Sequence, residues 1–512
     1  MKATKKLLAI LLAAVMLMAV LPGAFADDTA YSLTITGTKA GHTYLLYQIF
    51  TGTLTNEGGK LVLTDVKYGN GWKNQTAGTL VPQNVLNEFQ TASGETNIEK
   101  YLPNMPTVGN GTFATAPSAD GATVFTGLPA GYYLVIEADA DNLPVGETMT
   151  KHILQVVGDT SVALKASTVS SEKKVKDIND SEGTYSAWQD SADYDIGDDV
   201  PFQLSATVSD LLNDYKGPYA MTFHDHQSDG LTFNQGSVEV FVKTSSGSAE
   251  TKIDKTNYTV GSGSESSNSC TFEVHFDNLK DIPAVTPGST IIVRYTSKLN
   301  AKAKTGDPGN PNEMHITFSN NPNNDNPDNP HEEGETPDDK VTVFTFKLVV
   351  NKVQPVDGTQ EVEPLKGAAF KLSKKNSGGN YVEVTTLGTD KDHPIDKFEF
   401  TGLDDGDYML EETVTPEGFN TIAPIKFTIT AEHDIISDDP ELTKLLSGNL
   451  ADGGVQGVLS DGTITTAVVN IKGKTLPSTG GMGTTVFYII GSILVVCAGV
   501  LLISKKRMNG AK

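Results

Sequence analysis

Apolar and polar residues alternate with a period of two along most of the chain. Segments of this kind include "YSLTITG", "GYYLVIEA", "VEVFVKT", "IIVRYTSKL", "VTVFTFKLVV" and "IKFTIT". Turns rich in Gly, Asn, Asp and Pro separate them at short intervals, as is typical of β-strands. Helical periodicity is confined to short stretches, "PQNVLNEFQTA" (82–92) and "PELTKLLSG" (440–448). The pattern therefore predicts an all-β protein built from β-sandwiches.

The strand-rich region is long enough for about three domains of ordinary size. Composition changes near residues 166–171 and near Thr345, which predicts domains at 27–167, 168–345 and 346–475. The polar run 320–339 is expected to be a long surface loop inside the middle domain. Its Asp and Asn residues could bind Ca²⁺, but they lack the regular spacing of a calcium loop, so a solvated loop without metal is favoured.

Both ends of the chain carry apolar segments. Three lysines, an apolar run and "AFA" predict a secretory signal peptide over 1–26, cut between Ala26 and Asp27. Residues 486–503 carry no charge, and "KKR" follows at 505–507. This combination predicts a membrane-spanning helix with its basic end in the cytoplasm. Everything between the two segments is expected to lie outside the cell.

A short motif stands just before the predicted span. It consists of Leu476, Pro477, Ser478, Thr479 and Gly480. A simple tail anchor would need only an apolar span and a basic end. The pentapeptide therefore requires a function of its own.

Charge and cysteine content exclude some classes of binding partner and a disulfide within the exported part. The chain has 39 basic and 63 acidic residues, a net charge of −24, which disfavours nucleic acid and anionic membrane surfaces as partners. Of the two cysteines, Cys497 lies in the apolar span, so Cys270 cannot form a disulfide within the exported part. Because Cys270 alternates with Phe272 and Val274, it is expected to be a small buried hydrophobic residue.

An internal repeat places carboxylates among apolar residues. "FTGLPAGYYLVIE" (125–137) matches "FTGLDDGDYMLEE" (400–412), and the two segments end on Glu137 and Glu412. In a strand, Glu412 lies on the same face as the apolar residues two and four positions before it. Burying an unpaired carboxylate is costly, so each of these groups should have a partner.

In the two later domains, lysines and asparagines also alternate in register with inward-facing apolar residues. An inward Lys on an early strand, an inward acid midway and an inward Asn on a late strand occur twice in the same order. Singly, each could be explained by an edge strand whose polar group reaches solvent. The middle set is Lys173, Asp225 and Asn320, and the C-terminal set is Lys352, Glu412 and Asn470.

Burial would make the residues of these trios able to react with one another. It lowers the pKa of an amine and raises that of a carboxylic acid. A neutral lysine can then attack the carboxamide of Asn while the acid transfers protons, which forms an amide and releases ammonia. We therefore expect isopeptide bonds Lys173–Asn320, promoted by Asp225, and Lys352–Asn470, promoted by Glu412. The first domain lacks an in-phase Lys and Asn, so no such bond is expected there.

With these motifs the chain resembles the Gram-positive, sortase-assembled major (backbone) pilins over essentially its whole length. "LPSTGG" with the span and "KKR" resembles their cell-wall sorting signal. "YMLEETVTPEGF" (408–419) resembles their E-box, with Phe419 in place of the final Tyr, and "KGAAFKL" resembles the start of a collagen-adhesin B-type repeat. "EKKVKD", "FHDH" and "ITFSNNPN" resemble their isopeptide-forming fimbrial domain. The resemblance implies three tandem immunoglobulin-like (collagen-adhesin B-type) β-sandwiches followed by the sorting signal, 476–512.

The resemblance also implies how the pentapeptide is used. A pilin-class sortase would cut between Thr479 and Gly480, hold Thr479 as a thioester, and pass it to a lysine of the next subunit. A housekeeping sortase would finally join the fibre to peptidoglycan. Lys165 is the candidate acceptor by its position, although "QVVGDTSVALKAST" lacks the Trp and Tyr-Pro of the family's W-x-x-x-V-x-V-Y-P-K element. An ordinary exposed lysine is an equally open interpretation of Lys165.

The expected function is therefore that of the major structural subunit of a covalent, cell-wall-anchored pilus that supports adhesion. Other copies of the chain and minor pilins would be its partners. The alternative is a monomeric wall-anchored adhesin that binds a host ligand. An enzyme is disfavoured, because catalytic motifs are absent and "HDH" (224–226) directs both His away from Asp225 with no obvious third metal ligand. No cofactor and no metal are expected.

Overall fold

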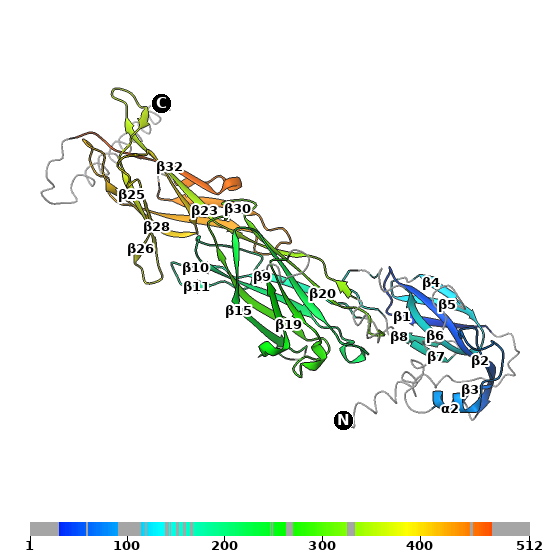
Figure 1. The fold of residues 1–512 in the computed structure, drawn as a ribbon. Helices are drawn as coiled ribbons and strands as arrows, with labels where there is room; N and C mark the ends of the chain where they lie inside the picture. The colour runs from blue at the N-terminus through cyan, green and yellow to red at the C-terminus, as the bar shows by residue number, and fades with distance from the viewer. Residues whose placement is uncertain are drawn as a thin grey trace, which may run out of the picture.

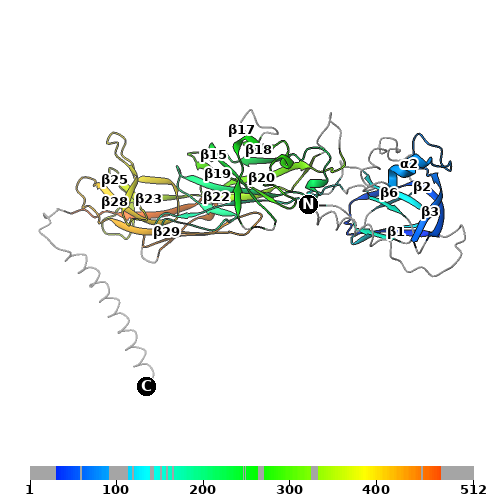
Figure 2. The same ribbon diagram turned by 90° about the horizontal axis from the view of Figure 1, so that it is seen from below.

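The computed structural model describes residues 30–57, 60–90, 114–117, 120–138, 143, 145–149, 153–156, 160–163, 167–245, 247, 249–262, 270–324, 333–450 and 454–473. In this part of the chain nearly all regular structure is β-strand. Three groups of sheets follow one another along an elongated molecule (Figures 1 and 2). We call them the N-terminal, middle and C-terminal parts. A search of the described residues for a helix long and apolar enough to cross a membrane finds none.

The N-terminal part pairs a five-stranded with a three-stranded sheet. Its elements are β1 (Tyr31–Thr36), β2 (Thr43–Glu57), β3 (Lys60–Tyr68), α2 (Gln83–Gln90), β4 (Ala114–Pro117), β5 (Ala122–Leu128), β6 (Gly131–Ala138), β7 (Ile153–Val156) and β8 (Thr160–Ala163). The larger sheet has the order β3-β2-β6-β7 with β4 on β2, and the smaller has the order β5-β1-β8. Apolar side chains such as Leu33, Tyr44 and Tyr133 fill the space between them. The short helix α2, expected from its periodicity, packs Val85 and Leu86 on a second apolar cluster.

The middle part is a larger sandwich. Its elements are β9 (Ser171–Val175), β10 (Ile178–Asn179), β11 (Thr184–Tyr185), β12 (Ser191–Asp193), β13 (Asp199–Thr207), η3 (Leu212–Asp214), β14 (Met221–Gln227), β15 (Leu231–Lys243), β16 (Glu250–Lys252), η4 (Lys255–Asn257), β17 (Thr259–Ser262), β18 (Phe272–Phe276), η6 (Leu279–Asp281), β19 (Thr290–Leu299), β20 (Asn310–Ser319), β21 (Glu333–Glu335) and β22 (Asp339–Phe344). A seven-stranded sheet, β12-β22-β20-β14-β18-β17 with β21 on β20, faces a five-stranded sheet, β16-β15-β19-β13-β9.

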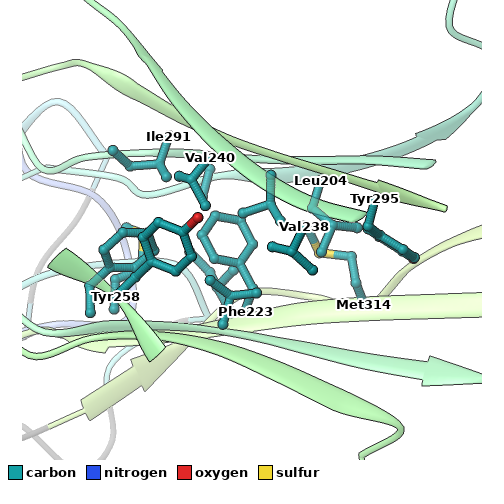
Figure 3. Close-up of a cluster of buried hydrophobic side chains, with 14 of the residues drawn as sticks. Leu204, Phe223, Val238, Val240, Tyr258, Ile291, Tyr295 and Met314 are labelled. Atoms are coloured by element: carbon teal, nitrogen blue, oxygen red, sulfur yellow. The ribbon is translucent and has the colours of Figure 1, made fainter. Parts of the chain in front are cut away.

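Alternation along the strands builds the core of this part. In β13 the apolar residues Phe202, Leu204 and Ala206 are buried, whereas the intervening residues are partly exposed. Such residues meet the inward side chains of the opposite sheet, as the period of two requires. Figure 3 shows the resulting cluster, in which Tyr295 and Met314 lie at one end.

The C-terminal part is a third sandwich. Its elements are β23 (Phe346–Pro355), β24 (Val362–Pro364), β25 (Ala369–Lys375), β26 (Tyr381–Leu387), β27 (Lys397–Leu403), β28 (Gly406–Val414), β29 (Ile425–His433), β30 (Leu442–Gly448), β31 (Val455–Gln456), η7 (Leu459–Asp461) and β32 (Thr463–Val469). A four-stranded sheet, β24-β23-β27 with β32 on β23, faces a six-stranded sheet, β26-β25-β28-β29-β30-β31. The first and last strands of this part, β23 and β32, are parallel neighbours.

Two local expectations were wrong. The segment "PELTKLLSG" contains strand β30, not a helix, because β30 pairs with β29 along its length and thereby buries Leu442 and Leu445. The polar run 320–339 is not only a loop, since it contains the short strand β21, which pairs with β20. In both segments pairing with the preceding strand overrides the local pattern.

A buried lysine joins the middle and C-terminal parts. The Nζ atom of Lys374 lies 2.6 Å from Asp180 Oδ2, 2.7 Å from Asp195 Oδ2 and 3.0 Å from Asp404 Oδ2. Asp180 and Asp195 belong to the middle part, and Asp404 belongs to the C-terminal part. Burial alone would lower the pKa of Lys374, but the surrounding carboxylates raise it well above its ordinary value. The lysine therefore stays charged and holds the two parts together.

Further titratable groups surround this junction. Burial and the nearby Asp193 raise the pKa of Asp177 to about 8 and that of Asp405 to about 7. The Nε2 atom of His433 lies 3.5 Å from Asp193 Oδ1. Burial lowers the pKa of His433, but Asp193 outweighs burial and the net shift is upward. The folded junction therefore binds protons that an unfolded chain would release.

These shifts predict that the junction weakens as the pH rises. An acid with a raised folded pKa stabilises the fold less as the pH climbs from about 4, the unfolded value, to its folded pKa. A histidine with a raised pKa loses its contribution as the pH rises through that folded pKa. Both effects lower the stability of the folded junction as the pH rises. We expect the full chain to melt at a lower temperature at pH 8.5 than at pH 5.5, as measured by calorimetry.

The double variant Asp177→Asn, Asp405→Asn should show a smaller decrease over this interval. The matched control is Asp392→Asn, at an exposed position of the C-terminal part, which should behave as the wild type does. A double variant with an unchanged pH profile would contradict this account of the junction.

Candidate isopeptide-forming sites

The C-terminal trio comes from three separate strands or strand ends. Lys352 lies on β23, and β23 pairs with β32 so that Lys352 is opposite Val468. Asn470 follows directly after β32, which brings its side chain to the side of Lys352. Glu412 lies on β28 in the opposite sheet, with its side chain directed into the sandwich. The three residues predicted from the sequence are therefore brought together.

Hydrogen bonds connect all three side chains. The Nδ2 atom of Asn470 donates to Glu412 Oε1 at 2.9 Å and to Glu412 Oε2 at 3.1 Å. Lys352 donates through Nζ to the side-chain oxygen of Asn470, and Nζ also lies 3.2 Å from Glu412 Oε1. The exposed fractions are 0% for Lys352, 8% for Glu412 and 1% for Asn470. The amine thus contacts the carboxamide in a site closed to bulk water.

The environment of Lys352 favours its uncharged form. Burial lowers the pKa of Lys352, and this effect outweighs the opposing attraction of Glu412. The centroid of the Phe370 ring lies 5.5 Å from Nζ, and a ring face in this position attracts the charged amine only weakly. A lowered pKa increases the fraction of free amine, which is the nucleophilic form.

The middle site joins the two sheets of its sandwich. Lys173 on β9 and Asp225 on β14 meet with Nζ 2.5 Å from Asp225 Oδ2. Tyr295 on β19 donates its hydroxyl to the same oxygen at 2.7 Å and lies 3.3 Å from Lys173 Nζ. Burial lowers the pKa of Lys173, although Asp225 opposes the shift. The structure thus brings together the lysine and the acid that the sequence predicts.

Asn320 does not belong to this site, and the expectation for it was wrong. On the paired strands β14 and β20, Asp225 is opposite Met314. Asn320 lies six positions beyond Met314, which corresponds to about 20 Å along an extended strand. Its backbone oxygen accepts a hydrogen bond from Met149 N at 2.7 Å, at the junction with the N-terminal part. Its side chain therefore cannot reach Lys173.

Asn312 takes the place expected for Asn320. It precedes Met314 by two positions on β20 and faces the same interior, where it is fully buried. Its Nδ2 atom donates to the hydroxyl of Tyr295 at 2.9 Å. Within the described part of the chain, its Oδ1 atom is buried without a hydrogen-bond partner. Asn312 is thus connected to Asp225 through Tyr295 and presents an unsatisfied carboxamide to the site.

The sequence contains signals for both missed residues. Asn312 alternates in phase with Met314, Ile316 and Phe318, which are all buried. Tyr295 likewise alternates with Ile291 and Val293 on β19. The same alternation continues to Asn320, so phase alone does not distinguish the two asparagines. The distinction depends on strand register.

In the N-terminal part the repeated carboxylate has a different partner. Glu137 on β6 is buried and contacts His42 Nδ1, whereas His42 Nε2 lies 2.7 Å from Glu147 Oε2. The hydrogen bond with Glu137 raises the pKa of His42. Lys39 reaches Glu147 from outside, with Nζ 2.9 Å from Oε1. The buried acid of this part thus contacts a histidine, whereas Asp225 and Glu412 each contact a lysine.

Several predicted residues lie outside the described residues. They are the signal-peptide cleavage pair Ala26 and Asp27, the candidate acceptor Lys165, and the sorting motif Leu476, Pro477, Ser478, Thr479 and Gly480.

Comparisons with known proteins cover both the body and the end of the chain. Residues 349–440 match the SpaA prealbumin-like fold domain, and residues 468–510 match the LPXTG cell wall anchor motif. Over 552 aligned positions the chain is 27% identical to the trypsin-resistant surface T6 protein of Streptococcus pyogenes serotype M6, covering 94% of this chain and 95% of that protein.

Solved structures extend the likeness to the arrangement of the sheets. The T6 backbone pilin of serotype M6 Streptococcus pyogenes, described as a modular three-domain structure, matches with a TM-score of 0.53 and 19% identity, covering 88% of this chain and 100% of that chain. The chain is thus similar to a Gram-positive backbone pilin in sequence and in the arrangement of its sheets, and it carries a cell wall anchor motif. The major pilin SpaD of Corynebacterium diphtheriae is also similar, with 16% identity, 88% and 99% coverage and a TM-score of 0.47.

The expected all-β, multi-domain fold is therefore confirmed. Its C-terminal end carries a cell wall anchor, as the pentapeptide, apolar run and basic tail indicated. Two members of the buried trio bracket most of the matched prealbumin-like domain in the sequence. Lys352 lies near the start of that domain, and Asn470 lies beyond its end.

Proposed function

We propose that the chain is the major structural subunit of a covalently polymerised pilus, joined end to end by a pilin-class sortase and anchored to peptidoglycan by a housekeeping sortase. The observation that carries the proposal is the combination of a cell wall anchor with three consecutive β-sandwich parts of the backbone-pilin type. The same comparisons indicate a structural subunit and not an enzyme. Its partners are other copies of the chain and minor pilins.

The joining reaction begins at the sorting motif. A sortase cysteine attacks the carbonyl carbon of Thr479, the Thr479–Gly480 bond breaks, and the amine of Gly480 leaves with the membrane span. The resulting thioester is then attacked by a lysine amine of the next subunit, which releases the sortase thiol and forms an amide. Lys165 is the proposed acceptor, because it lies at the end of the N-terminal part, just before the middle part.

We also propose an internal amide between Lys352 and Asn470. The free amine of Lys352 attacks the side-chain carbon of Asn470, and the bond from that carbon to Nδ2 breaks. Glu412, whose Oε1 lies 3.2 Å from Nζ and whose two oxygens contact Nδ2, takes a proton from the attacking nitrogen and passes it to the leaving nitrogen, which departs as ammonia. The contact geometry therefore supports Glu412 as the proton-transferring group.

The middle part supports the same reaction between Lys173 and Asn312. Asp225 contacts the amine directly and reaches the nitrogen of Asn312 through the hydroxyl of Tyr295. Protons can move along this chain of hydrogen bonds while the amide forms and ammonia leaves. The proposed bond is thus Lys173–Asn312, promoted by Asp225 with Tyr295 as a relay.

Such bonds would stiffen the fibre. The C-terminal bond spans 118 residues, and the middle bond spans 139 residues (312 − 173). By the chain-entropy argument used for disulfides, each would stabilise its part by about 5 kcal/mol. The C-terminal bond also ties the first strand, β23, to the end of the last strand, β32. A pull along the fibre would pass through the amide instead of unfolding the sheets.

The polymerisation proposal predicts a ladder. Co-expression of the full chain with a pilin-class sortase should give a series of high-mass bands on a denaturing gel after boiling, because the joints are covalent. Thr479→Ala should abolish both the ladder and the release of protein with wall fragments. Lys165→Ala should abolish the ladder and leave a monomer attached to the wall.

A single band from the wild type would point to the singly anchored adhesin instead. A ladder that persists in Lys165→Ala would assign the acceptor to another lysine, whereas the proposal for Thr479 would stand.

The internal bonds predict a mass deficit. The intact mass of the soluble fragment 27–475 should fall about 34 Da below the mass calculated from its sequence, about 17 Da for each ammonia lost in forming an amide. Glu412→Ala and Asn312→Ala should each restore one step of about 17 Da, because each removes a reacting or proton-transferring group.

Two matched controls sharpen this test. Asn320→Ala should keep the full deficit, because Asn320 lies far from Lys173. Lys374→Ala should also keep it, since that buried lysine is held charged by three aspartates. A third step of about 17 Da in the wild type would show that the N-terminal part also forms a bond, contrary to the account given above.

A further inference from the structure

The outer face of strand β14 carries two histidines that the isopeptide site does not use. Asp225 points into the sandwich, so His224 and His226, its neighbours in the sequence, point to the opposite face. On that face His224 is paired with Glu273 of β18 and with His315 of β20. The rings of His224 and His315 stack at a centroid distance of 4.8 Å.

Cys270 lies against the same histidines. Its Sγ atom is 3.5 Å from His224 Nδ1 and 3.4 Å from His226 Nε2. Glu273 Oε1 is 2.9 Å from His224 Nδ1. The donor atoms of His224, Cys270 and Glu273 all lie within 4.8 Å of one another. The third ligand that the sequence did not reveal is therefore present.

The expectation that Cys270 is buried is confirmed, but its thiol contacts polar side chains. Strand β18 begins only at Phe272, so Cys270 lies before the strand and outside its pairing with β14. Although the cysteine is only 4% exposed, it is not among the described residues that form the apolar core of the middle part. Its burial is instead against polar side chains that can bind metal.

The spacing of these donors fits tetrahedral zinc. With zinc–sulfur bonds of about 2.3 Å and zinc–nitrogen bonds of about 2.0–2.1 Å, a sulfur and a nitrogen ligand lie about 3.5 Å apart on a tetrahedron. The two sulfur–nitrogen distances around Cys270 are 3.5 and 3.4 Å. Both histidine nitrogens therefore lie at about the tetrahedral distance from the Cys270 sulfur.

The orientation of His224 is also suitable for a metal ligand. Its Nε2 atom lies 3.0 Å from Thr317 Oγ1, which can accept the ring proton. In the tautomer with its proton on Nε2, the Nδ1 atom can bind a metal and is directed toward Cys270 and Glu273. Histidine ligands are commonly oriented in this way by a hydrogen bond from the second ring nitrogen.

We propose that His224, Cys270 and Glu273, with His226 as the fourth ligand, bind one Zn²⁺ ion on the outer face of the middle part. Thiolate and imidazole ligands select zinc over Ca²⁺ and Mg²⁺, which prefer oxygen. On binding, zinc displaces the thiol proton, which passes to solvent as the sulfur–zinc bond forms. The ion would clamp β14, which also carries Asp225, to the start of β18.

Cobalt titration tests this site directly. Metal-free full chain is titrated with Co²⁺, whose visible bands report tetrahedral geometry and whose near-ultraviolet band reports a bound thiolate. The wild type should bind about one Co²⁺ per chain with both signatures, and one equivalent of Zn²⁺ should remove them. An excess of Ca²⁺ should leave them unchanged. Bound Zn²⁺ should also raise the melting temperature of the metal-free chain, because it binds only the folded state.

Variants separate this site from surface binding. Cys270→Ser should lose the thiolate band, and His224→Gln should bind at least tenfold more weakly, since each lacks one ligand. His275→Gln is the matched control, because His275 lies on the same face of β18 and contacts Thr222 and Asp277 instead. It should bind as the wild type does.

Circular dichroism establishes that each variant is folded, and Glu273→Gln, which should weaken binding without removing the thiolate band, serves if Cys270→Ser does not fold. Absence of the thiolate band in the wild type, or equal binding by His224→Gln, would overturn the proposal.

Discussion

The constraint on which this molecule depends is the cost of burying a lysine. An ammonium group inside a sandwich must either be surrounded by opposite charge or lose its proton. Both solutions occur here. Lys374 has three aspartates within 3.0 Å and is held charged, whereas Lys352 and Lys173 each face one acid and have lowered pKa values. The number of neighbouring carboxylates thus separates an ion pair that joins two parts of the chain from an amine prepared to react.

The two reactive sites use the sandwich differently. In the C-terminal part Lys352 lies on β23, Asn470 directly follows the neighbouring parallel strand β32, and the opposite sheet supplies Glu412. In the middle part Lys173 reaches Asp225 across the sandwich, and Tyr295 connects that acid to an asparagine. The proposed bonds would therefore tie neighbouring strands in one part and opposite sheets in the other. Both arrangements connect an early strand to a late one, which suits a subunit pulled from its two ends.

The internal repeat shows that a shared strand pattern does not determine the chemistry. Glu137 and Glu412 occupy equivalent places in their matching segments, and both are buried. Glu412 contacts a lysine and an asparagine, whereas Glu137 contacts His42. A histidine can share a proton with the carboxylate, but it does not supply the alkyl amine of the proposed amide. The repeat thus preserves an inward acid and changes what that acid can do.

The sequence by itself determined the all-β class, the inward phase of the C-terminal trio, and the pairing of an inward Lys173 with an inward acid. These follow from a period of two, which is a local property of the backbone. Only the tertiary structure decided between Asn312 and Asn320, which share that phase, because strand register depends on pairing between distant segments. The same holds for Cys270, whose neighbours come from β14. The face on which a residue lies follows from the local sequence, whereas its contacts across strands depend on the register that folding establishes.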